Sequence, residues 1–193
     1  MRYLPILLII LLSFGCSKDS INPKDGQIVE LFVDHYAETS NQRISLLPGK
    51  ELITTYLEGF DERELGYTYK VRARTFYPKV PPQDGPNNWF IFEKVLSKEI
   101  YNSTEPFNIS LKYNGLFGSG IAFAFRNQVF EYGNYTLRPE NDAVKKQLEE
   151  VLLLRSKLES DYQYAIKVII NAEVIHDPSN RSKGYIVKSV AVQ

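Results

Sequence analysis

Apolar and polar residues alternate in long runs along most of this chain, and the pattern limits the folds that it can adopt. The clearest run covers residues 67–77, where Tyr67, Tyr69, Val71 and Ala73 alternate with polar residues. Alternation with a period of two is typical of a strand with one buried and one solvated face. Strands are also expected at 28–36, 44–47, 89–96, 162–172 and 184–192, and as a three-strand meander over 107–132.

Two segments have the helical period instead. Residues 140–158 place five apolar side chains on one face, opposite charged residues: Val144, Leu148, Val151, Leu152 and Leu158. Asn141 or Asp142 is suited to cap the start of this helix. Residues 50–60 place apolar side chains at 52, 53, 56, 57 and 60, which also fits one face of a helix. Strands mixed with helices predict the α+β class.

The order helix, long strand, loop, strand occurs twice. An ungapped shift of 95 residues superposes Tyr67 on Tyr162, Tyr69 on Tyr164 and Val95 on Val190. We therefore expect two similar units of antiparallel strands, each with one helix, at 27–98 and 105–193, the second being a divergent repeat of the first. A single mixed domain is the alternative.

The amino terminus has the pattern of an export signal. Met1 and Arg2 precede the apolar run 3–12, and polar residues begin at Ser17. A helix that crosses a bilayer needs about 20 apolar residues, so this run is too short for a permanent span. Residues 1–15 are therefore predicted to be a cleaved signal peptide.

Cys16 is the predicted site of lipid attachment. Ser13 and Gly15 are small residues just before the cysteine, and the segment resembles the lipobox of bacterial lipoproteins. The resemblance implies that the Cys16 thiol carries a diacylglycerol and that the new amino group is acylated. The polar residues that follow resemble the tether of Bacteroidota lipoproteins, so 16–26 is expected to be a lipidated tether. The residues leave one alternative open, an ordinary signal peptide near a buried or unpaired cysteine.

Charge and cysteine usage exclude several classes of protein. The chain has 23 basic and 23 acidic residues, which provides no positive field for gripping nucleic acid. One cysteine excludes an intrachain disulfide framework and a cysteine-rich zinc site. Removing 1–15 removes Arg2 alone among the charged residues, so the body is expected to be held at the membrane by lipid rather than by basic residues.

Four short segments in the first unit resemble one known family. They are Tyr56-Leu57-Glu58-Gly59-Phe60, Gly66-Tyr67-Thr68-Tyr69-Lys70-Val71, Pro81-Pro82-Gln83-Asp84 and 92–98. This succession is similar to that of domain-of-unknown-function family 4377, whose members are small domains of bacterial envelope lipoproteins. The resemblance covers 28–98 and implies an envelope lipoprotein. Many members carry a cysteine pair that this chain lacks, and the family implies no catalytic residue.

The sequence offers little material for catalysis. It contains no HExxH, CxxC, Walker or G-x-S-x-G motif, and the stretch with Gly115, Gly118 and Gly120 is interpreted as a turn. His35 and His176 each have an aspartate neighbour, Asp34 and Asp177. Adjacent residues of a strand point to opposite faces, so these pairs are interpreted as surface polar residues. We expect no enzyme activity, no cofactor and no metal site.

The expected function is binding. The leading hypothesis is a non-catalytic binding or scaffolding lipoprotein of the bacterial outer membrane, on its periplasmic or cell-surface side, whose partner is another envelope component. The alternative is a surface module that binds a glycan or a peptide. Its candidate ligand surface is formed by Tyr77 and Trp89, the aromatic residues that flank the proline-rich loop 78–88.

Overall fold

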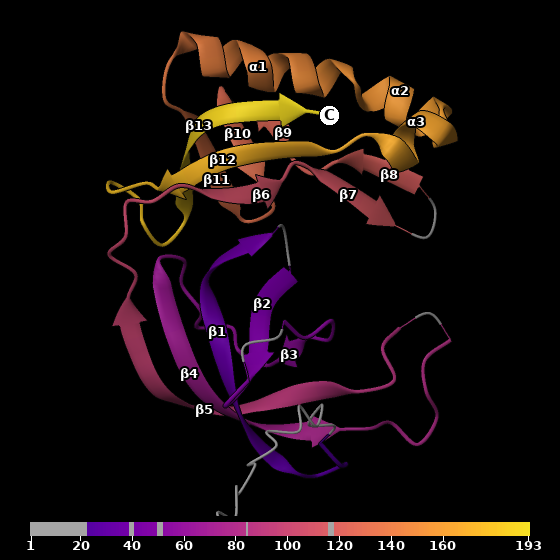
Figure 1. The fold of residues 1–193 in the computed structure, drawn as a ribbon, viewed down its shortest axis with the longest axis vertical. Helices are drawn as coiled ribbons and strands as arrows, with labels where there is room; N and C mark the ends of the chain where they lie inside the picture. The colour runs from indigo at the N-terminus through magenta and orange to yellow at the C-terminus, as the bar shows by residue number, and fades with distance from the viewer. Residues whose placement is uncertain (1–22, 39–40, 50–51, 84, 116–117) are drawn as a thin grey trace, which may run out of the picture.

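A computed structural model describes residues 23–38, 41–49, 52–83, 85–115 and 118–193. Strands account for 49% of the described residues and helices for 15%, which confirms the expected α+β class and shows that strands dominate it. Figure 1 shows one sheet below and a second sheet with the helices above. The predicted signal peptide and Cys16 lie outside the described residues.

Five strands form the first sheet, in the spatial order β2-β1-β4-β5-β3. They are β1 (Ile28–Glu38), β2 (Asn41–Leu46), β3 (Leu57–Glu58), β4 (Tyr67–Phe76) and β5 (Trp89–Ile100). Neighbouring strands are antiparallel, except that β3 is parallel to β5. The strands expected at 28–36, 67–77 and 89–96 are confirmed, and the one expected at 44–47 overlaps β2.

The two faces of the first sheet differ in polarity because successive side chains of a strand point to opposite sides. One face forms a buried cluster with the segment that precedes β4, and its residues include Val29, Leu31, Val33, Leu57, Phe60, Tyr69, Val71 and Ala73. The other face carries ion pairs between strands. Glu30 lies 2.7 Å from Nζ of Lys70, and Glu93 lies 3.0 Å from Nε of Arg72.

Six strands form the second sheet, in the order β6-β12-β13-β11-β10-β9. They are β6 (Phe107–Ser110), β9 (Ala124–Arg126), β10 (Val129–Tyr132), β11 (Tyr135–Pro139), β12 (Ile170–His176) and β13 (Gly184–Val192). A separate hairpin consists of β7 (Lys112–Gly115) and β8 (Gly118–Ile121). The strand expected at 184–192 is confirmed, whereas the glycines interpreted as a turn lie within the hairpin strands.

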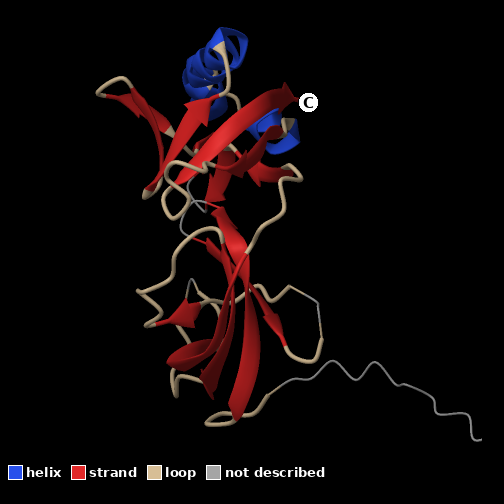
Figure 2. Cartoon of the chain, turned by 90° about the vertical axis from the view of Figure 1, so that its left-hand side faces the viewer, coloured by secondary structure: helices blue, strands red, loops and turns tan. Residues whose placement is uncertain are grey.

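Three helices follow one another in the described part of the chain, and Figure 2 shows them at the end of the molecule away from the first sheet. They are α1 (Asp142–Leu153), α2 (Arg155–Ser160) and α3 (Tyr162–Lys167). The Asn141 side chain caps α1 by accepting a hydrogen bond from the Val144 amide. α1 contacts β13 and β11, while α2 and α3 contact β8. The helix expected at 140–158 is confirmed as α1 and α2, which meet at Leu154.

The two sheets meet at a junction of buried contacts. His35 of β1 contacts His176 of β12, and the Ala37 amide donates a hydrogen bond to the Tyr185 hydroxyl of β13. The Leu65 amide donates to the Ser182 carbonyl. Leu65 and Ala37 belong to the apolar cluster of the second sheet, so that core extends into the junction.

The helix expected at 50–60 is wrong over its described residues. Residues 52–60 form an isolated bridge at Leu52, bends and the short strand β3. The Thr55 hydroxyl donates to the Asn88 carbonyl, and Gly59 has a φ of +82°. These features hold the segment across the sheet in a non-helical path. The described part of 27–98 therefore contains no helix, contrary to the expected pair of units with one helix each.

The strand expected at 162–172 is also wrong for its first six residues. Residues 162–167 form α3, whose start is capped by Asp161, and the strand begins only at Ile170. The shift of 95 residues therefore pairs Tyr67 of a strand with Tyr162 of a helix.

Candidate functional site

Trp89 lies in an aromatic cluster at the start of β5. Its ring stacks on Tyr56, with 5.5 Å between ring centroids, and lies 4.8 Å from the ring of Phe76, its partner across β4 and β5. The indole N–H donates a 2.7 Å hydrogen bond to Glu58. Tyr56 is 44% exposed, so the cluster presents an aromatic surface to solvent.

Tyr77 lies just after β4 and is half-buried. Its amide donates a 2.9 Å hydrogen bond to the Asp25 carboxylate, which ties the end of β4 to the start of the described chain. The sequence singled out Tyr77 and Trp89, and the structure adds Tyr56 and Phe76 to the surroundings of Trp89. Tyr56 and Phe76 lie outside loop 78–88 and its two flanking residues, so the sequence pattern did not indicate them. The position of Phe76 opposite Trp89 can be predicted once the two strands are paired.

The two histidines face each other at the junction of the sheets. Nδ1 of His35 lies 2.8 Å from Nε2 of His176, and the Tyr101 ring stacks on His35 with 3.5 Å between centroids. The Phe107 ring closes the group from the side. His35 is 6% exposed and His176 is 7% exposed, so the interpretation of these histidines as surface residues is wrong.

The two imidazoles share one hydrogen bond, in which one ring nitrogen donates and the other accepts. Nδ1 of His176 is buried and has no hydrogen-bond partner in the described part of the chain. A carboxylate oxygen of Asp34 lies 3.7 Å from Nε2 of His35. The 3.7 Å distance exceeds hydrogen-bond reach, so Asp34 does not orient the imidazole as an aspartate does in a catalytic triad.

Both histidines favour the neutral form. Burial, with the positive charges of Arg63 and Arg43, lowers the pKa of His35 from 6.5 to about 4. Burial, the His35 ring and the charges of Arg181 and Arg63 lower the pKa of His176 from 6.5 to about 3. The pair is therefore uncharged at neutral pH and serves to connect the sheets.

Asp177 is engaged away from its neighbouring histidine. Its carboxylate accepts hydrogen bonds of 2.7 and 3.0 Å from the Arg138 guanidinium, and further bonds from the hydroxyl and amide of Ser179. These bonds hold the pKa of Asp177 well below its usual range. Asp177 is 4% exposed, so its interpretation as a surface residue is also wrong.

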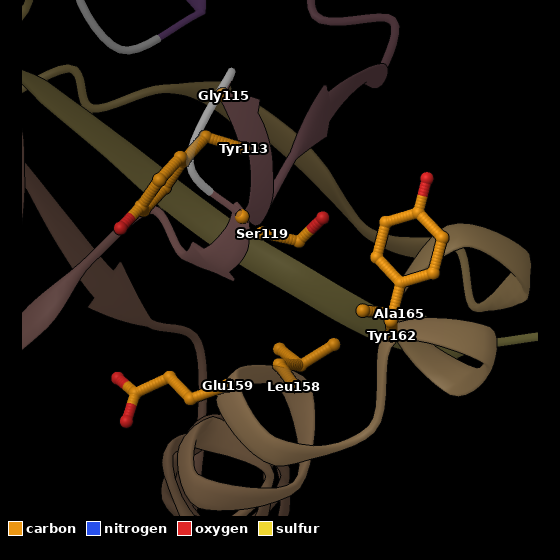
Figure 3. Close-up of a pocket in the computed structure, with 8 residues that line it drawn as sticks. Tyr113, Gly115, Ser119, Leu158, Glu159, Tyr162 and Ala165 are labelled. Atoms are coloured by element: carbon orange, nitrogen blue, oxygen red, sulfur yellow. The ribbon is translucent and has the colours of Figure 1, made fainter.

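A pocket of about 430 Å³ lies between the β7–β8 hairpin and helices α2 and α3 (Figure 3). Its lining residues come from both sides: Tyr113, Gly115, Gly118, Ser119, Leu158, Glu159, Tyr162 and Ala165. In Figure 3 the Ser119 hydroxyl points toward the Tyr162 ring, while Tyr113 and Glu159 extend to the other side. The sequence pattern does not indicate this site, because it favours a strand where Tyr162 lies on a helix.

Within the described ranges, no three histidine, cysteine or acidic side chains gather closely enough to hold a metal ion. The helices of the described residues are too short or too polar to cross a membrane.

The search of protein-family models found no match, and neither did the searches of curated proteins and of solved structures.

Proposed function

We propose that this protein is a bacterial envelope lipoprotein, anchored to the outer membrane by lipid on Cys16, whose body binds another envelope component without catalysis. One observation carries the proposal: the apolar run 3–12 is too short to remain as a span and leads directly to Ser13-Phe14-Gly15-Cys16. Several acyl chains on one cysteine anchor a protein stably where a single chain does not.

The burial of both histidines favours the non-catalytic part of this proposal. Histidine is the most frequent general acid or base of enzymes. Here both histidines are buried and hydrogen-bonded to each other between two sheets. Their position favours a structural role for the residues that are otherwise best suited to acid-base chemistry.

We also propose that the body consists of two structural units, 27–98 and 105–193, the first of them related to family 4377. The first sheet has a separate apolar cluster, formed by residues between Val29 and Val95. The cluster of the second sheet is formed mainly by residues between Phe107 and Val190. Each sheet therefore has its own core, with the histidine junction between them.

The anchor is tested by fractionating cells that express the full-length protein. The wild type is expected in the outer-membrane fraction, resistant to washing with concentrated salt, because lipid rather than charge holds it. The variant Cys16→Ser is expected to leave that fraction while its body keeps its fold. Ser17→Ala is the matched control and keeps the anchor. Retention of Cys16→Ser in the outer membrane would argue against the proposal.

A second candidate function is binding of a glycan or a peptide at the surface that includes Tyr77 and Trp89. The exposed Tyr56 ring stacked on Trp89 favours it, because aromatic faces contribute strongly to binding surfaces. Trp89 is the chain's single tryptophan, so its fluorescence reports on this surface alone. Quenching by a glycan or peptide would support the surface, and unchanged emission across a broad panel would exclude it.

A further inference from the structure

The pocket between the hairpin and the short helices has an apolar base and aromatic walls. Leu158 and Ala165 are each only 2% exposed, so the base is part of the folded core. Tyr113 is 52% exposed and Tyr162 is 71% exposed, which leaves large parts of both rings open to solvent. A volume of about 430 Å³ is in the range of pockets that hold small molecules.

The two walls are fixed to each other before any ligand arrives. Nζ of Lys112 on β7 donates hydrogen bonds to the carbonyls of Ala165 and Val168 at the end of α3. The Ser119 hydroxyl donates a 2.7 Å bond to the Asn114 side chain across the hairpin. A site whose walls are already fixed loses less conformational entropy on binding.

The Tyr113 ring occupies the space that a side chain at Gly120 would fill. The two residues are cross-strand partners, and a Cβ atom on Gly120 would lie 2.6 Å from the Tyr113 hydroxyl oxygen and 2.7 Å from Cζ. The ring therefore lies against the backbone of the facing strand. One of its faces is covered by the hairpin, while about half of the residue stays exposed to solvent.

The polar groups at the pocket favour a ligand with hydroxyl groups and no negative charge. Glu159 makes no ion pair with any residue that the structure describes, and its carboxylate can only accept hydrogen bonds. Two nearby lysines contact other groups, since Nζ of Lys112 donates to backbone carbonyls and Nζ of Lys157 lies 3.8 Å from the centroid of the Tyr164 ring. Glu159 is the charged residue among those that line the pocket, so its carboxylate would repel an anionic ligand there.

We propose that this pocket binds a neutral saccharide, with a sugar ring against the open face of Tyr113 or Tyr162 and its hydroxyl groups donating to Glu159 and Ser119. The two rings lie on different sides of the pocket in Figure 3, which suits an extended chain better than the enclosed cage that an organic cation requires. This inference rests on the proposed binding role, but it depends neither on the anchor nor on the Trp89 surface.

The test is a titration of the full-length protein in a detergent without a sugar head group. The probes are neutral oligosaccharides of the glucan, mannan, xylan and chitin types, with spermidine as a cationic comparison. At least one oligosaccharide is expected to bind with a Kd of about 1 mM or tighter. Tyr162→Ala and Glu159→Gln are each expected to weaken it about tenfold or more. Both side chains are exposed, so these variants are expected to fold normally.

Two further variants locate the site. Gly120→Ala is expected to weaken binding because its methyl group displaces the Tyr113 ring. Tyr56→Ala, which removes an exposed tyrosine from the Trp89 surface, is the matched control and is expected to leave the affinity and the pocket unchanged. Trp89 emission should stay constant during the titration, which separates this site from the other candidate surface.

Three results would overturn the inference. The first is no binding by any oligosaccharide of the panel. The second is binding that Tyr162→Ala and Glu159→Gln leave unchanged, or that Tyr56→Ala abolishes. The third is binding of spermidine alone, lost in Glu159→Gln, which would make the pocket a cation site. None of these results bears on whether Cys16 carries lipid, because the anchor is tested separately by fractionation of the Cys16→Ser variant.

Discussion

Nδ1 of His35 and Nε2 of His176 lie 2.8 Å apart, although 141 positions separate the residues in the chain. His35 belongs to the first sheet and His176 to the second, so this hydrogen bond is one of several that connect the two halves of the fold. Both rings are buried and neutral, and the charged groups near them are the acidic Asp34 and the basic Arg43, Arg63 and Arg181.

The histidine pair predicts that stability falls in mild acid. In the unfolded chain each histidine takes up a proton near pH 6.5, whereas in the folded protein this requires a pH of about 4 for His35 and about 3 for His176. Between these values the unfolded state binds more protons, so the free energy of unfolding decreases as the pH falls below 6.5. Urea unfolding at pH 7 and pH 4.5 is expected to show a loss of at least about 1.4 kcal/mol, the equivalent of one pKa unit.

His176→Gln supplies the control for this pH dependence. Glutamine can still donate a hydrogen bond to His35 but does not titrate, so the variant is expected to lose less stability between pH 7 and pH 4.5 than the wild type. An equal loss in both proteins would show that other groups cause the effect.

We expect a substitution of Gly66 to destabilise the same junction. Its φ of +75° is unfavourable for other residues, and a Cβ atom there would lie 2.4 Å from Cγ of Arg181, whose guanidinium donates to the Tyr101 carbonyl. Gly66→Ala is expected to lower the free energy of unfolding by about 2 kcal/mol or more, because backbone strain and the displaced arginine add. Chemical denaturation measures the change.

Gly59→Ala is the matched control for Gly66→Ala. Gly59 has a similar φ of +82°, but no atom lies within 4 Å of its added Cβ, so only the backbone strain of about 1 kcal/mol applies. Equal costs for the two substitutions would contradict the proposed contact with Arg181.

The partly buried ion pair between Arg138 and Asp177 is expected to stabilise the fold more than an exposed ion pair does. Among the described residues, Arg138→Ala leaves the Asp177 carboxylate, whose side chain is 5% exposed, with its Ser179 partners alone. The expected loss is about 1 to 3 kcal/mol in the free energy of unfolding. Lys145→Ala breaks an exposed pair with Glu149 and is expected to cost less than about 0.5 kcal/mol. Similar losses from both substitutions, again by chemical denaturation, would contradict the role of burial.

Much of the fold could be predicted from the sequence because burial of one face leaves an alternating pattern. The strand 67–76 shows it, since Tyr69, Val71 and Ala73 are buried on one side. The same pattern failed at 162–167, where Tyr162 and Ile166 alternate with polar residues but are exposed on a helix. The signal for that helix was Asp161, whose carboxylate accepts from the Tyr164 amide as an N-cap.

The candidate sites were less predictable because they depend on contacts between distant segments. His35 and His176 were each considered with the adjacent aspartate, whereas their actual partner is the other histidine. The pocket joins a glycine-containing hairpin to two short helices, and neither segment alone carries a recognisable motif. Pairing across the sheets has no local signature in the sequence.

We propose that lipid on Cys16 holds this protein at the membrane. The most direct measurement is mass spectrometry of the amino-terminal peptide of protein purified from native membranes. We predict that the peptide begins at Cys16 and carries a diacylglycerol on sulfur and an acyl chain on its amino group. A free Cys16 thiol, or a chain that still begins at Met1, would contradict the account.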